Sequence, residues 1–352
     1  MATTSFIFLL ISFLTITTHG HSNHPTTTSV YLSPSPKSLF SNYNKMLNFF
    51  KIYIYPSHNH TSTPPLIYTT PQESQFYNSL IKSPFITQDP THAHLFFLPF
   101  PSSSSTRSIA RLIKNIRTTF PYWNRTLGAD HFYLSSTGVD SSSDRNIVEL
   151  KKNSIQISCF PTMPGFFIPH KDITLPPVHR FQLINPVNDT VTISLTGYLK
   201  LNKPVPLSLI DKLNGHPDFK VEYNVNNKFA KNSKFCLFVY GYDDMAWMVE
   251  AMGSRCVPVV ITDRPIQDLP LMDVIDWSEI AVFVGTSGGV EGVKRVLDGI
   301  NESRYEEMME SGVTATRHLV WNEEPQPQDV FHMIVYQLWL RRHTIRYARW
   351  TE

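Results

Sequence analysis

The sequence has little charge, little glycine and few cysteines for its length. Charged residues make up 17% of its 352 positions, against the roughly 25% that is typical of soluble domains. Its 31 basic and 29 acidic residues leave a net charge of +2, which excludes a protein that binds nucleic acid through bulk positive charge. Fourteen glycines against 26 prolines exclude a glycine-rich repeat. The 41% of hydrophobic residues need burial, so the chain is not disordered as a whole.

Cysteine and nucleophile motifs are also scarce. The three cysteines are too few for a disulfide scaffold, and no CxxC or Cys/His spacing suggests a zinc site. Cys236 and Cys256 have the surroundings of small apolar core residues, so we expect them, and Cys159, to be free thiols. The chain lacks GxSxG, HExxH and both glycine-rich phosphate motifs, which argues against an α/β-hydrolase and a P-loop enzyme.

The N-terminus predicts a targeting segment. Its apolar run, from Phe6 to Ile16, is shorter than the roughly 20 residues of a spanning helix and contains hydroxyl side chains. Residues 1–20 therefore read as a signal peptide or signal anchor, and the Ser/Thr/Pro-rich residues 21–47 as a stalk. The N-x-Ser/Thr sequons are compatible with a lumenal chain and lie at Asn59, Asn124, Asn188 and Asn301.

Strand and helix patterns then alternate in two successive series, which predicts two α/β domains with parallel sheets covered on both faces. The predicted strands of the first series include KIYIYP, HLFFLPF, HFYLSS and SIQISC, and those of the second include VTISLTG, FKVEY, KFCLFVYGY, CVPVVI and IAVFV. We expect an N-terminal domain over residues 48–180, a C-terminal domain over 181–325, and a C-terminal helix within 326–352.

The segment from Lys234 to Ile261 is the most informative for binding, because it reads strand, glycine turn, helix, strand. Ligands of a parallel sheet bind beyond the carboxyl ends of its strands, and Gly241 and Tyr242 stand at such an end. A phosphate could bind at the start of the following helix, and Glu250 within it could accept a hydrogen bond from a ribose hydroxyl. The alternative is an ordinary crossover with a solvated glutamate.

A second polar segment, residues 121–132, precedes a predicted strand. It reads PYWNRTLGADHF and ends in Asp130 and His131, which could act as acid or base at a sheet edge. The alternative is a structural loop whose polar side chains satisfy backbone groups.

Eight segments, in this order over residues 48–342, together resemble the exostosin family, the plant glycosyltransferases of family 47. They are KIYIYP, FITQDPTHAHLFFLPF, YWNRTLGADHF, HKDITLP, KFCLF followed by GY, RCVPVVITD, DVIDWSEIAVFV and DVFHMIVYQLWLRR. The resemblance implies a GT-B-type α/β fold with two Rossmann-like domains. It also implies a nucleotide-sugar donor in the C-terminal half, a glycan acceptor in the N-terminal half, and generally inverting transfer. No bound metal or other cofactor is expected, because basic side chains and a helix N-terminus neutralise the departing diphosphate.

The sequence departs from the family pattern where the donor diphosphate should bind. Members usually carry Ser-Pro-Arg, two apolar residues and Glu after the Gly-Tyr pair. Here the stretch is GYDDMAWMVEA, which is one residue shorter, with Ala246, Trp247 and Met248 where the proline, the arginine and an apolar residue are expected. Because of the one-residue gap, either Trp247 or Met248 stands near the missing arginine. Asp243 and Asp244 add negative charge where the donor is negative.

Two further departures concern the strand ends. Residues 135–137 read Ser-Ser-Thr where many members have Cys-His-Asp, and Val205 and Pro206 stand where members often have Ile-Arg. Lys200 and Lys203 could supply the missing charge, although lysine lacks the bidentate fork of arginine.

The sequence therefore predicts a glycosyltransferase that moves a sugar from a nucleoside diphosphate to a cell-wall polysaccharide or glycan. Asp130 is the candidate general base. The candidate donor-binding residues are Gly241, Tyr242, Glu250, Lys200 and Lys203. By resemblance, the protein is a single-pass type II protein of the Golgi membrane, with a lumenal catalytic part and other glycosyltransferases as partners; a secreted form is the alternative. Because of the departures, a non-catalytic lumenal protein that binds polysaccharide or a partner enzyme is the second hypothesis.

Overall fold

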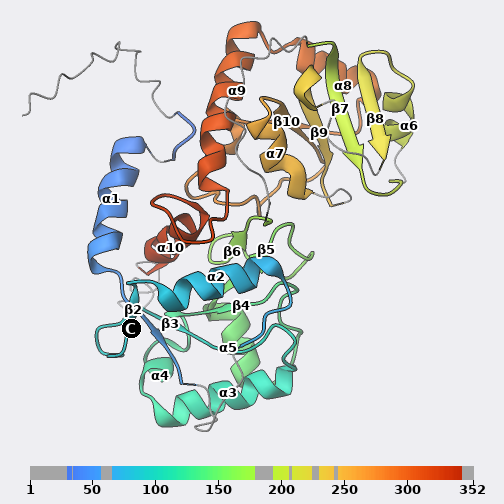
Figure 1. Ribbon diagram of the computed structural model, residues 1–352. Helices are drawn as coiled ribbons and strands as arrows, with labels where there is room; N and C mark the ends of the chain where they lie inside the picture. Colours follow the sequence, from blue (N-terminus) through green and yellow to red (C-terminus); the bar gives the residue numbers. More distant parts are fainter. Residues whose placement is uncertain are drawn as a thin grey trace, which may run out of the picture.

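The computed structural model describes residues 30–33, 35–56, 66–178, 193–205, 208–223, 230–241 and 245–342. These residues form two α/β domains that lie one above the other (Figure 1). In the N-terminal domain, six parallel strands follow the order β2-β1-β3-β4-β5-β6. They are β1 (Ile52–Ile54), β2 (Ile86–Thr87), β3 (Leu95–Phe97), β4 (His131–Leu134), β5 (Ile155–Cys159) and β6 (Ile173–Leu175).

Helices cover both faces of this sheet, as the alternating pattern predicts. One face packs against α3 (Thr106–Thr119), α4 (Tyr122–Thr126) and α5 (Arg145–Asn153). The other packs against α2 (Pro71–Lys82), α1 (Pro36–Phe49) and the C-terminal helix α10 (Val330–Arg341). Helix α3 shows the local cause: Ser105 caps its first turn, and Ile109, Ile113 and Ile116 recur at helical spacing and are buried.

The C-terminal domain has five parallel strands in the order β11-β10-β9-β7-β8. They are β7 (Leu195–Leu201), β8 (Phe219–Tyr223), β9 (Ser233–Val239), β10 (Val257–Ile261) and β11 (Val282–Val284). On one face lie α6 (Ser208–Asn214), α8 (Gly289–Asp298) and part of α9 (Glu302–Ala315), and on the other lies α7 (Met248–Gly253). Short 3-10 turns complete the described elements: η1 (Ala230–Asn232), η2 (Met245–Trp247), η3 (Trp277–Glu279) and η4 (Thr316–His318).

Both sheets share one winding order. When the strands are numbered within each domain, both sheets contain the spatial order 2-1-3-4-5, and the N-terminal sheet adds a sixth strand after the fifth. In such a doubly wound sheet the ligand crevice opens at the switch point, between the carboxyl ends of the first and third strands. The switch points are therefore between β1 and β3 in the N-terminal domain, and between β7 and β9 in the C-terminal domain. The predicted pair of parallel-sheet domains is confirmed, and its division falls between β6 and β7.

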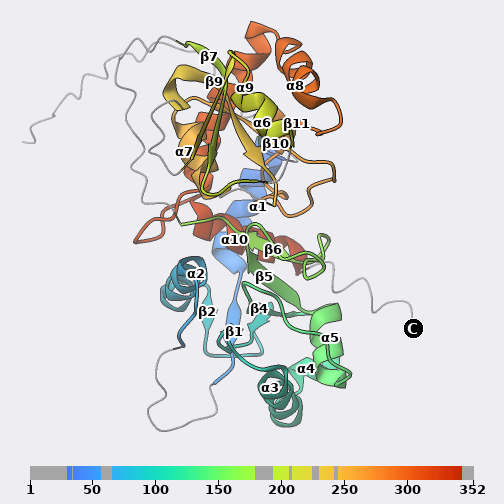
Figure 2. The ribbon, with the colours of Figure 1, turned by 90° about the vertical axis from the view of Figure 1, so that its right-hand side faces the viewer.

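The domains share one hydrophobic core. A single cluster of buried residues includes Phe97 of β3, Phe331 of α10 and Phe238 of β9. Helix α10 follows the C-terminal domain in the chain but lies between the two sheets (Figures 1 and 2). Because the core passes through α10, the two domains are packed together without a solvated boundary at this point.

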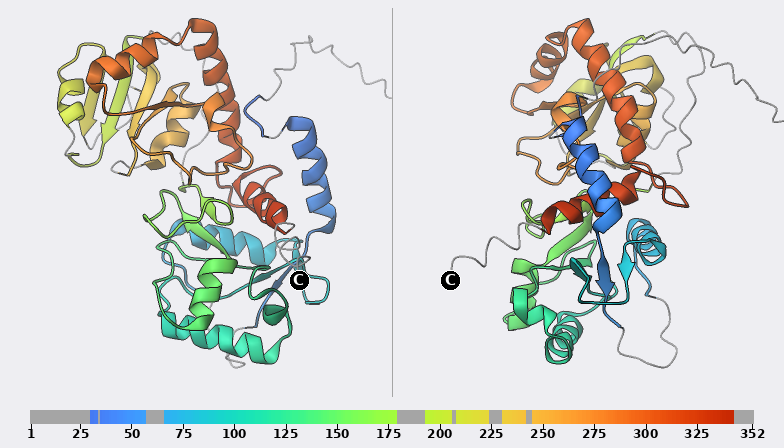
Figure 3. Two further views of the ribbon diagram at one scale, coloured as in Figure 1. Left: turned by 180° about the vertical axis from the view of Figure 1, so that it is seen from behind. Right: turned by 90° about the vertical axis from the view of Figure 1, so that its left-hand side faces the viewer.

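The prediction of a stalk up to residue 47 is wrong. Leu39, Tyr43 and Met46 are buried on one side of α1, which runs along both domains (Figure 3). The serine and proline at its start are the N-cap and the first helical residue, so they mark a helix terminus and no stalk. Ahead of it, Leu32 forms an antiparallel bridge with Ile275 of the C-terminal domain. Residues 1–29, which include the predicted targeting segment, lie outside the described residues.

The expectation of three free cysteines is wrong for two of them. Cys236 and Cys256 form a disulfide, whereas Cys159 is free. Cys236 lies in β9 and Cys256 immediately precedes the neighbouring strand β10, and the parallel register pairs Cys236 with Pro258. The register thus brings the two thiols together, which small apolar surroundings alone did not reveal. Within the described part of the chain, no helix has the length and apolar character needed to cross a bilayer.

The disulfide should contribute measurably to stability. It closes a loop with a sequence separation of 20, for which chain entropy predicts about 3 kcal/mol. Replacing Cys236 and Cys256 together by alanine should lower the free energy of unfolding by about that amount in urea titration. Cys159→Ala is the control and should have a smaller effect. Non-reducing peptide mapping that finds both Cys236 and Cys256 as free thiols would contradict the pairing.

Candidate functional site

The carboxyl edges of the two sheets meet at the buried side chain of Asp268. Its Oδ2 accepts hydrogen bonds from the backbone N (2.8 Å) and Oγ1 (2.7 Å) of Thr162, which follows β5. Its Oδ1 accepts one from the hydroxyl of Tyr240, which follows β9, at 2.5 Å. Burial and the neighbouring carboxylate raise the pKa of Tyr240, so its hydroxyl remains a donor at neutral pH. Ligands bound at the two carboxyl edges therefore lie on the same side of the molecule.

Two predicted donor residues meet at the switch point of the C-terminal sheet. Lys203 follows β7 and Gly241 follows β9, and these strands are neighbours. The strands β7 and β8 run toward the N-terminal domain (Figure 1), so Lys203 faces the interdomain side and its side chain is exposed. Gly241 has a φ of +82°, which explains why glycine occupies this turn. Tyr242, Asp243 and Asp244 lie outside the described residues.

Lys200 and Glu250 lie near the same face of that sheet. Lys200 is the register partner of Glu222 in β8. Because side chains of a strand alternate between its faces, Lys200 lies on the same face as Tyr198, two residues before it. The hydroxyl of Tyr198 donates to Glu222 at 3.2 Å. Burial, Glu222 and then Glu250 raise the pKa of Tyr198. Glu250 is half-buried and lies in α7, which packs on this face of the sheet. The fold thus gathers Lys200, Lys203, Gly241 and Glu250 around the carboxyl end of β7 and β9.

The position where the family arginine is expected belongs to the core. Trp247 is only 4% exposed, and its ring lies 4.4 Å from that of Phe238 and 5.8 Å from that of Tyr198. Met248 is also buried. An aromatic side chain therefore stands where a charged group is expected. Among the predicted donor residues, Lys200 of β7 and Lys203 after it carry positive charge at the neighbouring strand end.

Asp130 immediately precedes β4, so it lies at the amino edge of its sheet. The expected crevice opens at the opposite, carboxyl edge. Its carboxylate accepts hydrogen bonds from Thr126 and from Arg125 (2.9 Å to Nη2), and Nδ1 of His131 lies 2.8 Å away. Burial raises the pKa of this carboxyl, but His131, Thr126 and Arg125 together hold it below its usual range. A base should have a pKa near the working pH and reach the acceptor. This placement favours the alternative interpretation, a structural loop.

The switch point of the N-terminal sheet holds a residue that the sequence analysis missed. Glu73, in the first turn of α2, is completely buried. Its Oε1 accepts hydrogen bonds from Oγ of Ser102 (2.6 Å), in the loop after β3, and from the backbone N of Ser136 (2.7 Å), after β4. Its Oε2 accepts from Oγ1 of Thr70 at 3.0 Å. The only sequence signal is Thr-x-x-Glu, which suggests a helix cap and no site.

Two further polar groups lie beside Glu73. Sγ of Cys159, at the end of β5, is 3.3 Å from Oγ1 of Thr70, and burial raises the pKa of this thiol to about 12. The hydroxyl of Tyr68 is buried and has no hydrogen-bond partner among the described residues. Burial, Tyr77 and Glu73 raise its pKa. Both groups are therefore protonated at neutral pH, and Tyr68 keeps an unused donor.

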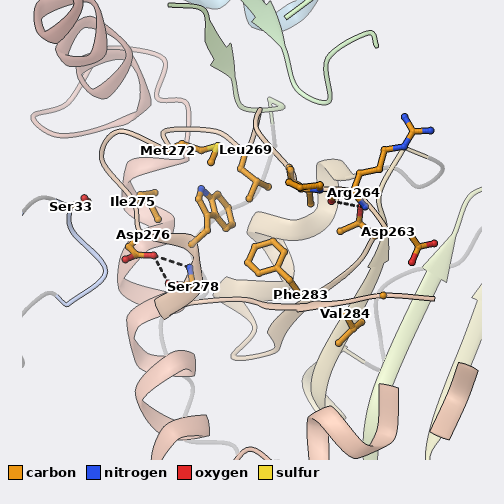
Figure 4. A pocket seen from close by; sticks show the side chains of 15 residues that line it. Ser33, Asp263, Arg264, Leu269, Met272, Ile275, Asp276, Ser278, Phe283 and Val284 are labelled. Carbon is orange, nitrogen blue, oxygen red and sulfur yellow. Dashed lines mark hydrogen bonds between the residues drawn. The ribbon is translucent and has the colours of Figure 1, made fainter. Parts of the chain in front are cut away.

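A cavity of about 700 Å³ opens beyond the carboxyl ends of β10 and β11. Phe283 and Leu269 lie near its centre, with Asp276 toward one end and Asp263 and Arg264 toward the other (Figure 4). An apolar centre with a few polar groups at its rim is typical of small-ligand sites. None of the predicted site residues lines it, although the segments RCVPVVITD and DVIDWSEIAVFV supply most of its lining. Among the described residues, no group of three or more His, Cys, Asp and Glu side chains could hold a metal ion.

Asp130→Asn should lower stability and leave turnover nearly unchanged. Loss of the charge leaves Arg125 without its partner, and we expect a cost of about 1 to 3 kcal/mol at pH 7. Since the pKa of Asp130 is lowered in the folded protein, its stabilisation is complete at neutral pH and is lost as the pH falls through that value. Urea titrations of both proteins should therefore converge toward acid pH. A turnover loss of about a hundredfold or more, without loss of stability, would restore Asp130 as the base.

Lys203→Ala should weaken binding of UDP about tenfold or more, because charge-assisted contacts contribute about 1.5 to 3 kcal/mol. Lys234→Ala is the matched control. Lys234 lies in β9 near its amino end and is paired with Glu302 at 2.6 Å, so UDP affinity should not change. Calorimetric titration of UDP measures both. Equal losses in the two variants would place the anion elsewhere.

The chain is similar in sequence to known glycosyltransferases. The chain is 29% identical over 354 residues to a probable glycosyltransferase of Arabidopsis thaliana, which covers 89% of this chain and 72% of that protein. It is 25% identical over 304 residues to a probable beta-1,4-xylosyltransferase of the same plant, covering 73% and 72%. The solved structure of WaaG, a glycosyltransferase involved in lipopolysaccharide biosynthesis, aligns at 8% identity with a TM-score of 0.30, covering 86% of this chain and 95% of that one. The model of the exostosin GT47 domain matches residues 46–299, and the chain therefore belongs to this family of glycosyltransferases.

Proposed function

We propose that this glycosyltransferase moves a sugar, with inversion, from a nucleoside diphosphate to a cell-wall polysaccharide or another glycan. The observation that carries the proposal is that the carboxyl edges of the two sheets, where ligand crevices are expected, come together at Asp268, which accepts hydrogen bonds from Thr162 after β5 and from Tyr240 after β9. One crevice offers lysines, which suit a diphosphate. The other offers hydroxyl groups and a carboxylate, which suit a sugar. A two-substrate reaction needs both sites within reach of each other.

In the proposed donor site each residue has a distinct task. Lys200 and Lys203 neutralise the diphosphate as the bond to the sugar breaks, and the turn at Gly241 gives the backbone room to approach it. Glu250 accepts hydrogen bonds from the ribose or sugar hydroxyls. With lysine in place of arginine, the diphosphate meets single charges and no bidentate fork. We therefore expect its affinity to depend on several weak contacts, so that no single substitution abolishes binding. No resident metal is proposed.

The alternative, a non-catalytic protein that binds polysaccharide or a partner enzyme, draws its support from the departures from the family pattern, above all the missing arginine. Two features weigh against it. The C-terminal crevice keeps exposed lysine and a carboxylate at its edge, and the N-terminal crevice keeps a fully buried carboxylate that packing alone does not require. We therefore favour an active enzyme.

For location, we propose the Golgi lumen, with the N-terminus as a type II membrane anchor. The disulfide between Cys236 and Cys256 supports an oxidising compartment, and the sequons are compatible with it. Carbonate extraction from plant membranes tests the anchor, which a soluble form beginning near residue 21 would contradict.

The function is tested by measuring UDP release. The purified lumenal part is offered UDP-xylose, UDP-glucuronic acid, UDP-galactose and UDP-glucose, each with and without a pool of wall oligosaccharides. Xylose and glucuronic acid are included because relatives from Arabidopsis and rice carry those sugars in their names. We expect release that depends on acceptor with at least one donor, and NMR of the product should show an inverted anomeric centre. Glycan binding without UDP binding or release would support the non-catalytic alternative.

A further inference from the structure

Glu73 does more than cap the first turn of α2. In a capping box the carboxylate turns back to the backbone N of the N-cap residue and stays near solvent. Here it bonds only to the hydroxyl of the N-cap, Thr70, and its other oxygen reaches across the switch point to Ser102 and Ser136. The side chain is completely buried. Its position is therefore determined by the crevice between β1 and β3 as well as by its own helix.

The carboxylate is buried without a cation. Its hydrogen-bond donors are two hydroxyls and one backbone N–H, and it forms no ion pair within the described residues. A buried charge without an opposite charge is costly, and three neutral hydrogen bonds compensate it only in part. One lone pair of Oε2 accepts no hydrogen bond from the described residues.

Ser102 stands between this carboxylate and the crevice. Its side chain is half-buried, whereas Glu73 is not exposed at all. Because the single hydroxyl proton of Ser102 is donated to Oε1 at 2.6 Å, the lone pairs of its Oγ face other donors. A sugar hydroxyl that enters the crevice meets Oγ of Ser102 as an oriented acceptor. The buried hydroxyl of Tyr68, which has no partner among the described residues, is a second group that points to a ligand here.

We propose that Ser102 and Glu73 form a relay that takes the proton of the acceptor hydroxyl during transfer. The proposal rests on the proposed function. As the acceptor oxygen forms its bond to the anomeric carbon, the bond from that carbon to the diphosphate breaks and the diphosphate leaves with the electron pair. The proton of the acceptor hydroxyl moves to Oγ of Ser102, and the proton of Ser102 moves to Oε1 of Glu73. Ser102 is thus the catalytic residue that touches substrate, and Glu73 acts through it.

Ser102→Ala tests the relay in the UDP-release assay, with the four UDP-sugars and the oligosaccharides pooled so that the true substrates are present. We expect kcat to fall about a hundredfold, at the lower end of what general base catalysis supplies, while the affinity for UDP stays within twofold. Ser102→Thr restores a hydroxyl and should recover most of kcat. Ser103→Ala, at the exposed neighbour, is the matched control and should behave as wild type.

Two measurements separate a relay from a merely structural contact. The dependence of kcat on the deuterium fraction of the solvent should be curved in the wild type, because two protons move together, and this curvature should vanish in Ser102→Ala. Glu73→Gln should lower kcat as strongly, with thermal unfolding followed by circular dichroism to show whether it folds; should it not fold, the Ser102 variants still decide.

The outcomes also separate the relay from the proposed function. A wild type that releases no UDP overturns both. A wild type that turns over, with Ser102→Ala within threefold of its kcat, overturns the relay alone. A loss in Ser102→Ala that comes with lower UDP affinity and lower thermal stability, and that Ser102→Thr does not rescue, shows a structural contact and likewise overturns the relay.

Discussion

The hydrogen bonds to Asp268 are the contact on which the geometry of the site depends. They tie the end of β5 to the end of β9, so that two separately wound sheets present their carboxyl edges to the same space. Thr174 of β6 adds a hydrogen bond to the backbone O of Leu269 at 3.4 Å. The shared core through α10 supplies most of the free energy of this contact, since apolar burial is the dominant favourable term, and the carboxylate fixes its direction.

Four of the buried carboxylates in the described part of the chain differ in the kind of partner they have. Asp130 and Asp172 each lie beside a basic side chain, Arg125 and Lys171 respectively. Asp268 and Glu73 have only neutral donors, and both stand at carboxyl ends of strands. A neighbouring cation offsets the cost of burying the carboxylate charge, which suits a carboxylate with a structural role. Neutral donors leave a charge that can respond to another group, which is what a site at the edge of a sheet needs.

The structure around Trp247 shows what this chain has where the family pattern expects an arginine. The family places an arginine where this chain has buried aromatic packing around Trp247, yet the lysines of β7 remain at the adjacent strand end. The two halves of the site therefore differ in how they depart from the family. On the proposed donor side, buried Trp247 precedes α7, the helix after β9. On the proposed acceptor side, the backbone N of Ser136 in the Ser-Ser-Thr stretch donates a hydrogen bond to Glu73.

The sequence alone determined the class of fold, the two series of strands, the family, and the strand end that carries Gly241. These follow from local periodicity and from the rule for parallel sheets, neither of which needs long-range contacts. Only the tertiary structure decided which residues meet. It placed Asp130 at the amino edge of its sheet, away from the carboxyl ends where ligands bind, because Asp130 immediately precedes β4 and the strands are parallel. It paired Cys236 with Cys256 through strand register, and turned a predicted stalk into α1 through burial against both domains. It also made Glu73 part of a site, because its partners Ser102 and Ser136 are 29 and 63 residues away in the chain and only the winding of the sheet brings them together.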